Sequence, residues 1–149
     1  MLNVPLPNSG KPDDQELRVV EDITKWMAVN SEGIYATRPW KVSGNIAAPA
    51  PDQQLGFNER NRKDLTAADV RFTTKGDTLY AYVMGWPDRE AAIPTLARGG
   101  KLNVGSIRSV ELLGHHGKLK FTQDEQSLRV TLPPEKSSDH AICLKVVGA

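Results

Sequence analysis

The sequence has a single cysteine, Cys143, and few aromatic residues, which make up 6% of the chain. One cysteine excludes an internal disulfide framework and any zinc site built on cysteine ligands. Long apolar runs are also missing, since none approaches the roughly 20 residues that a membrane-spanning helix needs. The first residues, 1–5, lack the basic start and apolar run of a signal peptide. We therefore expect no membrane partner, and the compartment stays undetermined.

An excess of one charge is absent as well. The chain carries 19 Lys and Arg residues against 18 Asp and Glu residues, which gives a net charge of +1. No basic run stands out, and no stripe of alternating basic and aromatic residues is present. Nucleic acid is therefore not an expected partner.

The common catalytic and ligand-binding motifs are missing too. The sequence has neither a Gly-x-Ser-x-Gly nucleophile elbow nor a Gly-rich phosphate loop. His115 and His116 lie between two glycines, as in a solvated turn, and alone provide too few ligands for zinc. Cys143 has no histidine nearby in the sequence that could activate it as a nucleophile. We predict no catalytic residue, no metal site and no cofactor.

The apolar residues that are present, 39% of the chain, suffice for one domain with a core. The first clear pattern predicts a helix over residues 12–30. Pro12 is tolerated at the first helical position, Asp13 and Asp14 favour the positive end of the helix dipole, and Gly33 is a stop signal. Apolar residues recur at helical spacing, namely Leu17, Val20, Ile23 and Met27, with Val19 and Trp26 on an adjoining strip.

Residues 2–7 resemble a short strand, closed by a turn at residues 8–10. A strand, a loop and a helix form the repeating unit of a (β/α)8 barrel, and here that unit occurs once. Residues 44–64 have little periodicity and are interpreted as a linker or long loop, which Leu55 and Phe57 could pin to a neighbouring surface. The expected domains are thus residues 1–43 as the end of a barrel, 44–64 as the linker, and 65–149 as a β domain.

From residue 70 onward the chain alternates between apolar and polar residues, the pattern of β-strands. The segment Lys75-Gly76-Asp77 joins the first two strands as a hairpin turn would. Strands are expected at residues 70–74, 78–86, 93–97, 106–113, 117–122, 128–132 and 142–146. Short strands at this spacing, separated by turn residues, predict an antiparallel β-sandwich and a mostly β protein.

One strand, at residues 78–86, departs from this alternation. Its second face carries Tyr80, Tyr82, Met84 and Trp86, so both faces are apolar or aromatic. A loop or helix of the same chain could cover the second face, or another domain could dock on it. A third alternative is that its aromatic rings contact a sugar.

Several separated segments resemble one known family. They are residues 3–5, 26–30, 33–40 (Gly-Ile-Tyr-Ala-Thr-Arg-Pro-Trp), 66–87, 109–114 and 128–133. Together they resemble the C-terminal portion of the bacterial α-L-fucosidases, the retaining glycoside hydrolases of family 29. The resemblance implies that residues 1–30 correspond to the last strand and helix of the catalytic barrel, and that a β-sandwich follows. Full-length relatives are often periplasmic or secreted.

The same resemblance implies that this chain alone is inactive. Retaining glycosidases need two carboxyl groups about 5 Å apart. In the family both come from earlier barrel strands and loops, so no catalytic residue is assigned here. The expected role is that of a non-catalytic region that packs on and stabilises a fucosidase barrel, in cis as in the family or in trans. The alternative is an independent module that binds fucosylated glycan through Tyr80, Tyr82 and Trp86.

Overall fold

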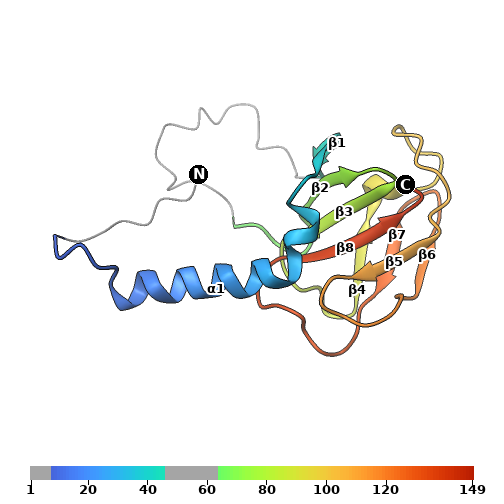
Figure 1. Ribbon diagram of the computed structural model, residues 1–149. Coiled ribbons are helices and arrows are strands. Elements are labelled where there is room, and N and C mark those ends of the chain that lie inside the picture. Colours follow the sequence, from blue (N-terminus) through green and yellow to red (C-terminus); the bar gives the residue numbers. More distant parts are fainter. Residues whose placement is uncertain (1–7, 46–63) are drawn as a thin grey trace, which may run out of the picture.

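The computed structural model describes residues 8–45 and 64–149. The strand predicted at residues 2–7 lies outside these residues, as does most of the predicted linker with Leu55 and Phe57. Figure 1 shows a β-sandwich from which one long helix projects. The chain is mostly β, and its antiparallel sandwich confirms the predicted fold class.

The helix, α1, spans Asp14–Asn30. Its N-cap is Asp13, whose side chain accepts hydrogen bonds from the backbone N–H groups of Gln15 and Glu16, each at 2.9 Å. The Glu16 carboxylate in turn accepts from the Asp13 N–H at 3.1 Å, which completes a capping box. Pro12 therefore lies before the cap and not at the first helical position. After Asn30 the chain tightens into a 3-10 turn, Ser31–Gly33.

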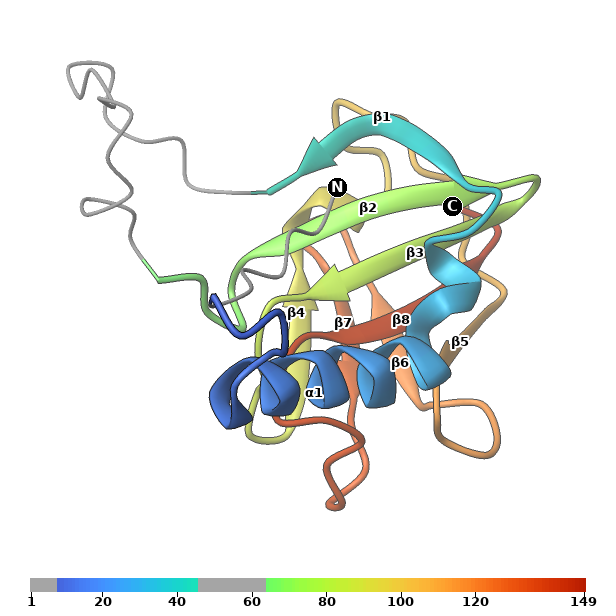
Figure 2. The ribbon, with the colours of Figure 1, turned by 60° about the vertical axis from the view of Figure 1, so that its left-hand side comes forward.

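Two antiparallel sheets form the sandwich. The larger has five strands in the order β1 (Arg38–Gly44), β2 (Val70–Lys75), β3 (Thr78–Val83), β8 (Ile142–Val147) and β5 (Ser109–Leu112). The smaller has three, in the order β4 (Glu90–Ile93), β7 (Leu128–Thr131) and β6 (Phe121–Gln123). Helix α1 lies on the side of the larger sheet opposite to the smaller sheet (Figure 2).

The predicted hairpin is present, with Lys75 and Thr78 paired around a two-residue loop of Gly76 and Asp77. Gly76 has a φ of +57°, a conformation that residues with a Cβ rarely adopt. Glycine with positive φ at the first central position is the pattern of a type II′ turn, whose twist matches that of antiparallel strands. The turn chemistry read from the sequence therefore fixes the β2–β3 register.

Other strand boundaries differ from the predicted ones. Strand β1 was not predicted from the sequence, yet it pairs with β2 at the edge of the larger sheet. The strand expected at 93–97 instead ends at Ile93 and is followed by a 3-10 turn, Pro94–Leu96. Pro94 has no N–H to donate to a ladder and suits the start of such a turn. Strand β6 begins at Phe121, four residues after the predicted start at 117.

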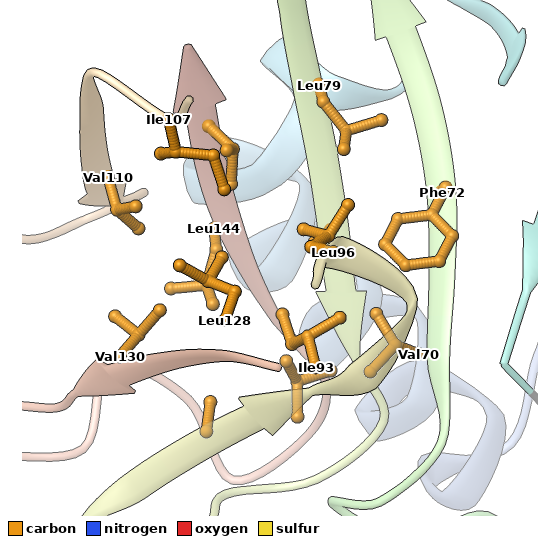
Figure 3. Packing of buried hydrophobic residues seen from close by; sticks show 14 of the residues in the cluster. Val70, Phe72, Leu79, Ile93, Leu96, Ile107, Val110, Leu128, Val130 and Leu144 are labelled. Carbon is orange, nitrogen blue, oxygen red and sulfur yellow. The ribbon is translucent and has the colours of Figure 1, made fainter. Parts of the chain in front are cut away.

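The core lies between the two sheets and is built from the inward faces of both (Figure 3). It includes Val70 and Phe72 of β2, Leu79 of β3, Leu128 of β7 and Leu144 of β8. The alternation of apolar and polar residues predicted for these strands therefore gives β3, β7 and β8 one face each in the core. The sandwich thus completes its main core without any residue of α1.

Candidate interface around helix α1

The outer face of the larger sheet is covered where β3 and β8 pass under the end of α1. Tyr80 and Tyr82 are only 2% and 4% exposed, and with the buried Cys143 they form a second, smaller cluster. Trp26 of α1 packs against this cluster, with its ring centre 5.8 Å from that of Tyr82. The structure therefore corresponds to the first of the three alternatives, coverage by a helix of the same chain.

Trp86 does not share this face. It is half-buried against the main core and lies beyond β3, which ends at Val83. Between Val83 and Trp86 the chain bends at Gly85, where an added Cβ would lie 3.1 Å from the Ala67 backbone nitrogen. Because strand alternation stops at Val83, the prediction that Trp86 lies beside the two tyrosines is wrong.

The two tyrosines bind the C-terminal end of α1 through their hydroxyl groups. Tyr82 donates to the carbonyl oxygen of Asn30 at 3.1 Å, and Tyr80 donates to Oε1 of Glu32 at 2.8 Å. Lys145 of β8 also reaches Glu32, with its Nζ 2.6 Å from the same oxygen. One carboxylate from the 3-10 turn is therefore held by side chains from two neighbouring strands.

A further hydrogen bond ties α1 to the segment that precedes β8. The indole Nε1 of Trp26 donates to the carbonyl oxygen of Ala141 at 2.6 Å. Asn30, the one fully buried polar residue of α1, donates from Nδ2 to the carbonyl oxygen of Trp26 at 3.0 Å. The indole is thereby held in one orientation between α1 and the sandwich.

Close packing at this contact requires a glycine. A Cβ at Gly33 would overlap the Tyr82 hydroxyl oxygen and would lie 3.0 Å from the ring of Tyr80. The carbonyl oxygen of Gly33 also accepts a hydrogen bond from Thr73 Oγ1 at 2.7 Å. Gly33 thus lets the backbone after α1 lie directly on the sheet.

The electrostatics of this contact favour a structural role. Burial raises the pKa of the Tyr80 and Tyr82 hydroxyls above their ordinary value, and burial raises the pKa of the Cys143 thiol to about 12. Hydrogen bonds from Lys145 and then Tyr80 lower the pKa of Glu32. The thiol therefore stays protonated and is not an activated nucleophile. Strand alternation turns Cys143 away from the face of Ile142 and Leu144, and it belongs to the smaller cluster while they belong to the main core.

Beside its contact face, α1 carries apolar side chains that are covered only in part: Leu17 is exposed, whereas Val20 and Met27 are half-buried. Leu17, Val20 and Met27 follow one line along the helix, and none of them packs against either core cluster. Leu17 is 45% exposed, although it is a large apolar side chain. We call these three residues the outer strip of α1. The N-terminal part of the helix that carries Leu17 projects beyond the sheets (Figure 1).

A groove runs between α1 and the segment that leads into β8. It measures about 320 Å³ and is mostly apolar, with Val19, Ile23 and Trp26 on the helix side and Ala141 opposite. Asp22 and His140 also line it. A second groove of about 190 Å³ shares Asp22, Trp26 and His140 with it. Val19 is 53% exposed at the first groove.

The remaining candidates from the sequence contribute no site. His115 and His116 are exposed in a turn, as predicted. Within residues 8–45 and 64–149, no group of three or more His, Cys, Asp or Glu side chains is placed to hold a metal ion. In the same ranges no helix is both long and apolar enough to cross a membrane.

Sequence reasoning missed the central role of Glu32 and Lys145. They are separated by more than a hundred positions, and neither belongs to a motif. Trp26 was placed on an apolar helix strip, but its bond to Ala141 depends on the packing of α1 on the sheet. The one available signal is the aromatic second face of β3, for which coverage by an element of the same chain is one of three predicted alternatives.

Comparisons with known proteins place these features in a family. The family model of the alpha-L-fucosidase C-terminal domain matches residues 62–147. The chain is 31% identical over 112 residues to the tissue alpha-L-fucosidase of Rattus norvegicus, covering 74% of this chain and 19% of that protein. The chain is 28% identical over 117 residues to the tissue alpha-L-fucosidase of Homo sapiens, and this match covers 74% of this chain and 19% of that protein. The chain spans about a fifth of the length of the curated relatives it matches.

Solved structures share the fold over almost the whole chain. The Thermotoga maritima alpha-fucosidase, solved with a mechanism-based inhibitor, has a TM-score of 0.69 at 18% identity. The match covers 99% of this chain and 30% of that one. Alpha-L-fucosidase isoenzyme 1 from Paenibacillus thiaminolyticus has a TM-score of 0.60 at 19% identity, with the same coverage. This chain belongs to the alpha-L-fucosidase C-terminal domain family.

Proposed function

We propose that this chain is the non-catalytic end of an α-L-fucosidase, which packs on the catalytic portion of the enzyme and stabilises it. The observation that carries the proposal is the outer strip of α1, an apolar strip that packs against neither core cluster and is exposed at Leu17. An unpaired apolar helix face indicates a surface that another element buries.

The extent of the matches supports the catalytic portion as that element. The C-terminal domain model begins at residue 62, whereas the fold shared with solved fucosidases covers 99% of this chain and so includes α1. The sandwich completes its own core, so α1 belongs to the fold without being needed for that core. In the matched fucosidase this fold covers only 30% of the chain. The remaining part is a natural source of a partner surface for the outer strip.

Two carboxylates lie on the rim of the smaller groove, Asp22 and Asp139, and both are exposed. Asp22 also forms an ion pair with Lys25, at 3.7 Å. The catalytic carboxyl groups of a retaining glycosidase lie in an enclosed site. Asp22 and Asp139 are not enclosed, so this groove does not provide such a site.

The predicted sites Tyr80 and Tyr82 are assigned as interface residues between α1 and the sandwich. The Tyr82 hydroxyl bonds to the last residue of α1, and its ring packs against Trp26. The Tyr80 hydroxyl bonds to Glu32 in the 3-10 turn, and its ring lies at Gly33. Contact with a sugar ring would require α1 to leave the sheet. Trp86, half-buried in the main core, offers no paired platform with them. The placement of these residues therefore favours a packing role over an independent glycan-binding module.

The test is hydrolysis of a chromogenic α-L-fucoside. The purified chain is assayed alone and after mixing with separately produced catalytic portions, taken from the Thermotoga maritima, Paenibacillus thiaminolyticus and rat enzymes and ending where the match to this chain begins. We expect no turnover by the chain alone and restored turnover in at least one mixture. Turnover by the chain alone, or no effect in any mixture, would contradict the proposal.

A matched pair of variants identifies the surface in the complementing mixture. Leu17→Lys places a charge in the outer strip, whereas Glu125→Gln makes the same change of one charge unit in the exposed loop between β6 and β7, on the smaller sheet and away from α1. Leu17→Lys should raise the concentration of chain needed for half-maximal activation by about tenfold, because a charge in a buried apolar contact weakens binding strongly. Glu125→Gln should leave that concentration within about twofold, as expected for a residue outside the contact.

A further inference from the structure

Basic side chains gather at one edge of the larger sheet. Its edge strand β1 pairs with β2, at the end of the strand order opposite to β5 (Figure 2). Lys41 of β1 also reaches the loop of residues 98–104, where its Nζ donates to the carbonyl oxygen of Leu102 at 3.0 Å. Three separate segments therefore meet at what we call the basic edge. They carry six basic residues, namely Arg38, Lys41, Arg71, Lys75, Arg98 and Lys101.

The basic edge departs from the charge balance of the chain. The three segments contain no Asp or Glu, although the whole chain has 18 acidic residues against 19 basic ones. The sequence shows no basic run because the six residues come from segments that only the fold brings together. A surface that carries one sign of charge attracts ligands of the opposite sign.

The charges of the basic edge are not used within the sandwich. In the part of the chain that the structure describes, none of the six residues forms an ion pair with a carboxylate. Glu32 lies near Lys75 but is already paired with Lys145. Five of the six are exposed, and only Arg71 is half-buried. The edge is therefore open to an anionic ligand.

The fold directs Arg71 toward the edge. Val70 and Phe72 belong to the core, so strand alternation turns Arg71 to the outer face of β2. Its side chain runs alongside Gly44 of β1, where an added Cβ would lie 3.2 Å from Cδ and 3.3 Å from Nη1. The lack of a side chain at Gly44 leaves room for the guanidinium group at the basic edge.

The strand at this edge favours a glycan over a peptide as the anionic ligand. A peptide that extends a sheet pairs with the free N–H and C=O groups of the edge strand, and Pro39 has no N–H to donate. Edge cations such as Arg38 and Lys41 also oppose strand addition. A glycan needs no such pairing, because guanidinium and ammonium groups bind its sulfate or carboxylate oxygens directly.

We propose that the basic edge binds anionic glycans, which carry sulfate or carboxylate groups. The proposal rests on the proposed function, because a glycosidase brings glycans to this surface. β1 begins shortly after the 3-10 turn at the end of α1, so the basic edge starts beside the helix that is assigned to the catalytic portion. A glycan held at the edge is thereby kept at a raised local concentration near that portion.

Binding to the chain alone tests the surface directly. Isothermal titration calorimetry is carried out with dextran sulfate, which carries sulfate, with polygalacturonate, which carries carboxylate, and with uncharged dextran. We expect binding of at least one anionic polymer and none of dextran, and the two anionic probes distinguish the two sources of charge. The affinity should fall by about tenfold or more as salt is raised to about 0.5 M, because salt screens exposed charges.

A matched pair of double variants locates the site. Arg38→Gln with Lys101→Gln removes two exposed charges from the basic edge, whereas Lys118→Gln with Lys120→Gln removes two exposed charges elsewhere. Lys118 forms a bridge to Glu111 of β5, at the opposite edge of the larger sheet. The first pair should weaken binding of the anionic polymer by about tenfold, and the second by less than about twofold. Thermal unfolding of both variants checks that the sandwich is intact.

The complementing mixture links the basic edge to catalysis. Its substrates are a fucosylated oligosaccharide that carries sulfate and the same oligosaccharide after desulfation. In the wild-type mixture the sulfated form should have the lower KM. The Arg38→Gln, Lys101→Gln variant should raise the KM of the sulfated form relative to the desulfated one by about threefold or more, because the attraction is lost. The Lys118→Gln, Lys120→Gln variant should leave this ratio unchanged.

The outcomes separate this proposal from the proposed function. Intact complementation without binding of either anionic polymer would refute the basic edge alone, as would an equal loss of binding in both double variants. Polyglutamate or duplex DNA that binds more tightly than either glycan at equal charge would also overturn it, in favour of an acidic protein or a nucleic acid. Glycan binding at the edge without activation of any catalytic portion would refute the proposed function alone.

Discussion

At the scale of single residues, Glu32 is the point at which the helical segment and the sheet are joined electrostatically. Its carboxylate accepts from Tyr80 and pairs with Lys145, so it is linked to both β3 and β8. The Glu32 side chain is 44% exposed, which means that water screens the ion pair considerably. The contact therefore serves orientation more than stability.

The first prediction concerns the pH dependence of this contact. Glu32→Gln should lower the free energy of unfolding at neutral pH by about 1 kcal/mol or less, the range of exposed ion pairs. Because the pKa of Glu32 is lowered in the folded chain, its contribution is present above the unfolded value of 4.5 and is lost as the pH falls through the folded pKa. Urea unfolding at a series of pH values should show the two proteins converging in acid. A constant difference would contradict this assignment.

Gly33 carries the second prediction. Gly33→Ala places a Cβ against the Tyr82 hydroxyl and the Tyr80 ring, both of which are buried and hydrogen-bonded. We expect a destabilisation of about 1–3 kcal/mol, the usual cost of overpacking. Gly100→Ala is the control, since the nearest atom to its added Cβ is 3.7 Å away. Chemical denaturation of both variants measures the difference, and equal losses would refute the role of Gly33.

At the scale of elements, α1 differs from the strands because only its last turns lie against the sandwich. The N-terminal turns depend on local interactions, chiefly the capping box of Asp13 and Glu16. Local helix stability and the stability of the sandwich should therefore be separable.

The third prediction follows from this separation. Asp13→Ala removes the cap, which should cost the helix about 1 kcal/mol. Hydrogen exchange should accelerate at the amides of residues 17–22 and remain unchanged in β3 and β8, because the fraying is local. Asp13→Asn, which keeps an acceptor at the cap, should restore most of the protection. Acceleration throughout the sheets would show that the helix and the sandwich unfold together.

The elements differ in how well the sequence predicts them. Strands β2, β3, β7 and β8 could be predicted because apolar residues alternate in them and because Gly76 marks the turn. Strand β1 could not, since Pro39 interrupts it and its edge position leaves Arg38 and Lys41 exposed. Edge strands are defined by the neighbour they pair with more than by their own pattern.

The candidate interface could be predicted only in part, because its contacts depend on which elements become neighbours in the fold. The aromatic second face of β3 indicates a contact of some kind, with a covering element as one of three alternatives, and the periodicity of α1 predicts an amphipathic helix. The contacts between them join residues far apart in the sequence, such as Trp26 with Ala141 and Glu32 with Lys145. Such pairs become visible only once the packing of the helix on the sheet is known.

At the scale of the whole molecule, the sandwich and α1 differ in how much of their apolar surface is buried. The sandwich closes its main core between its own sheets, whereas α1 keeps exposed apolar side chains at Leu17 and Val19. Under the proposed function, these side chains form an adhesive surface until the catalytic portion covers them.

The fourth prediction addresses that surface in the isolated chain. The double variant Leu17→Lys with Val19→Lys should reduce self-association in sedimentation velocity at high concentration. Its free energy of unfolding should change by no more than about 0.5 kcal/mol, because both side chains are exposed and outside the core clusters. Unchanged association, or a large loss of stability, would show that the exposed residues do not form the adhesive surface.

The buried thiol of Cys143 also provides a chemical probe for opening of the contact between α1 and the sheet. Cys143 is fully buried and its pKa is about 12, so a thiol-specific dye can label it only after the helix lifts or the sheet opens. Since it is the one cysteine of the chain, every labelling event reports on that site. The labelling rate of the native chain thus reports how often this contact opens, by lifting of α1 or by opening of the sheet, and a bound catalytic portion should slow the lifting of α1.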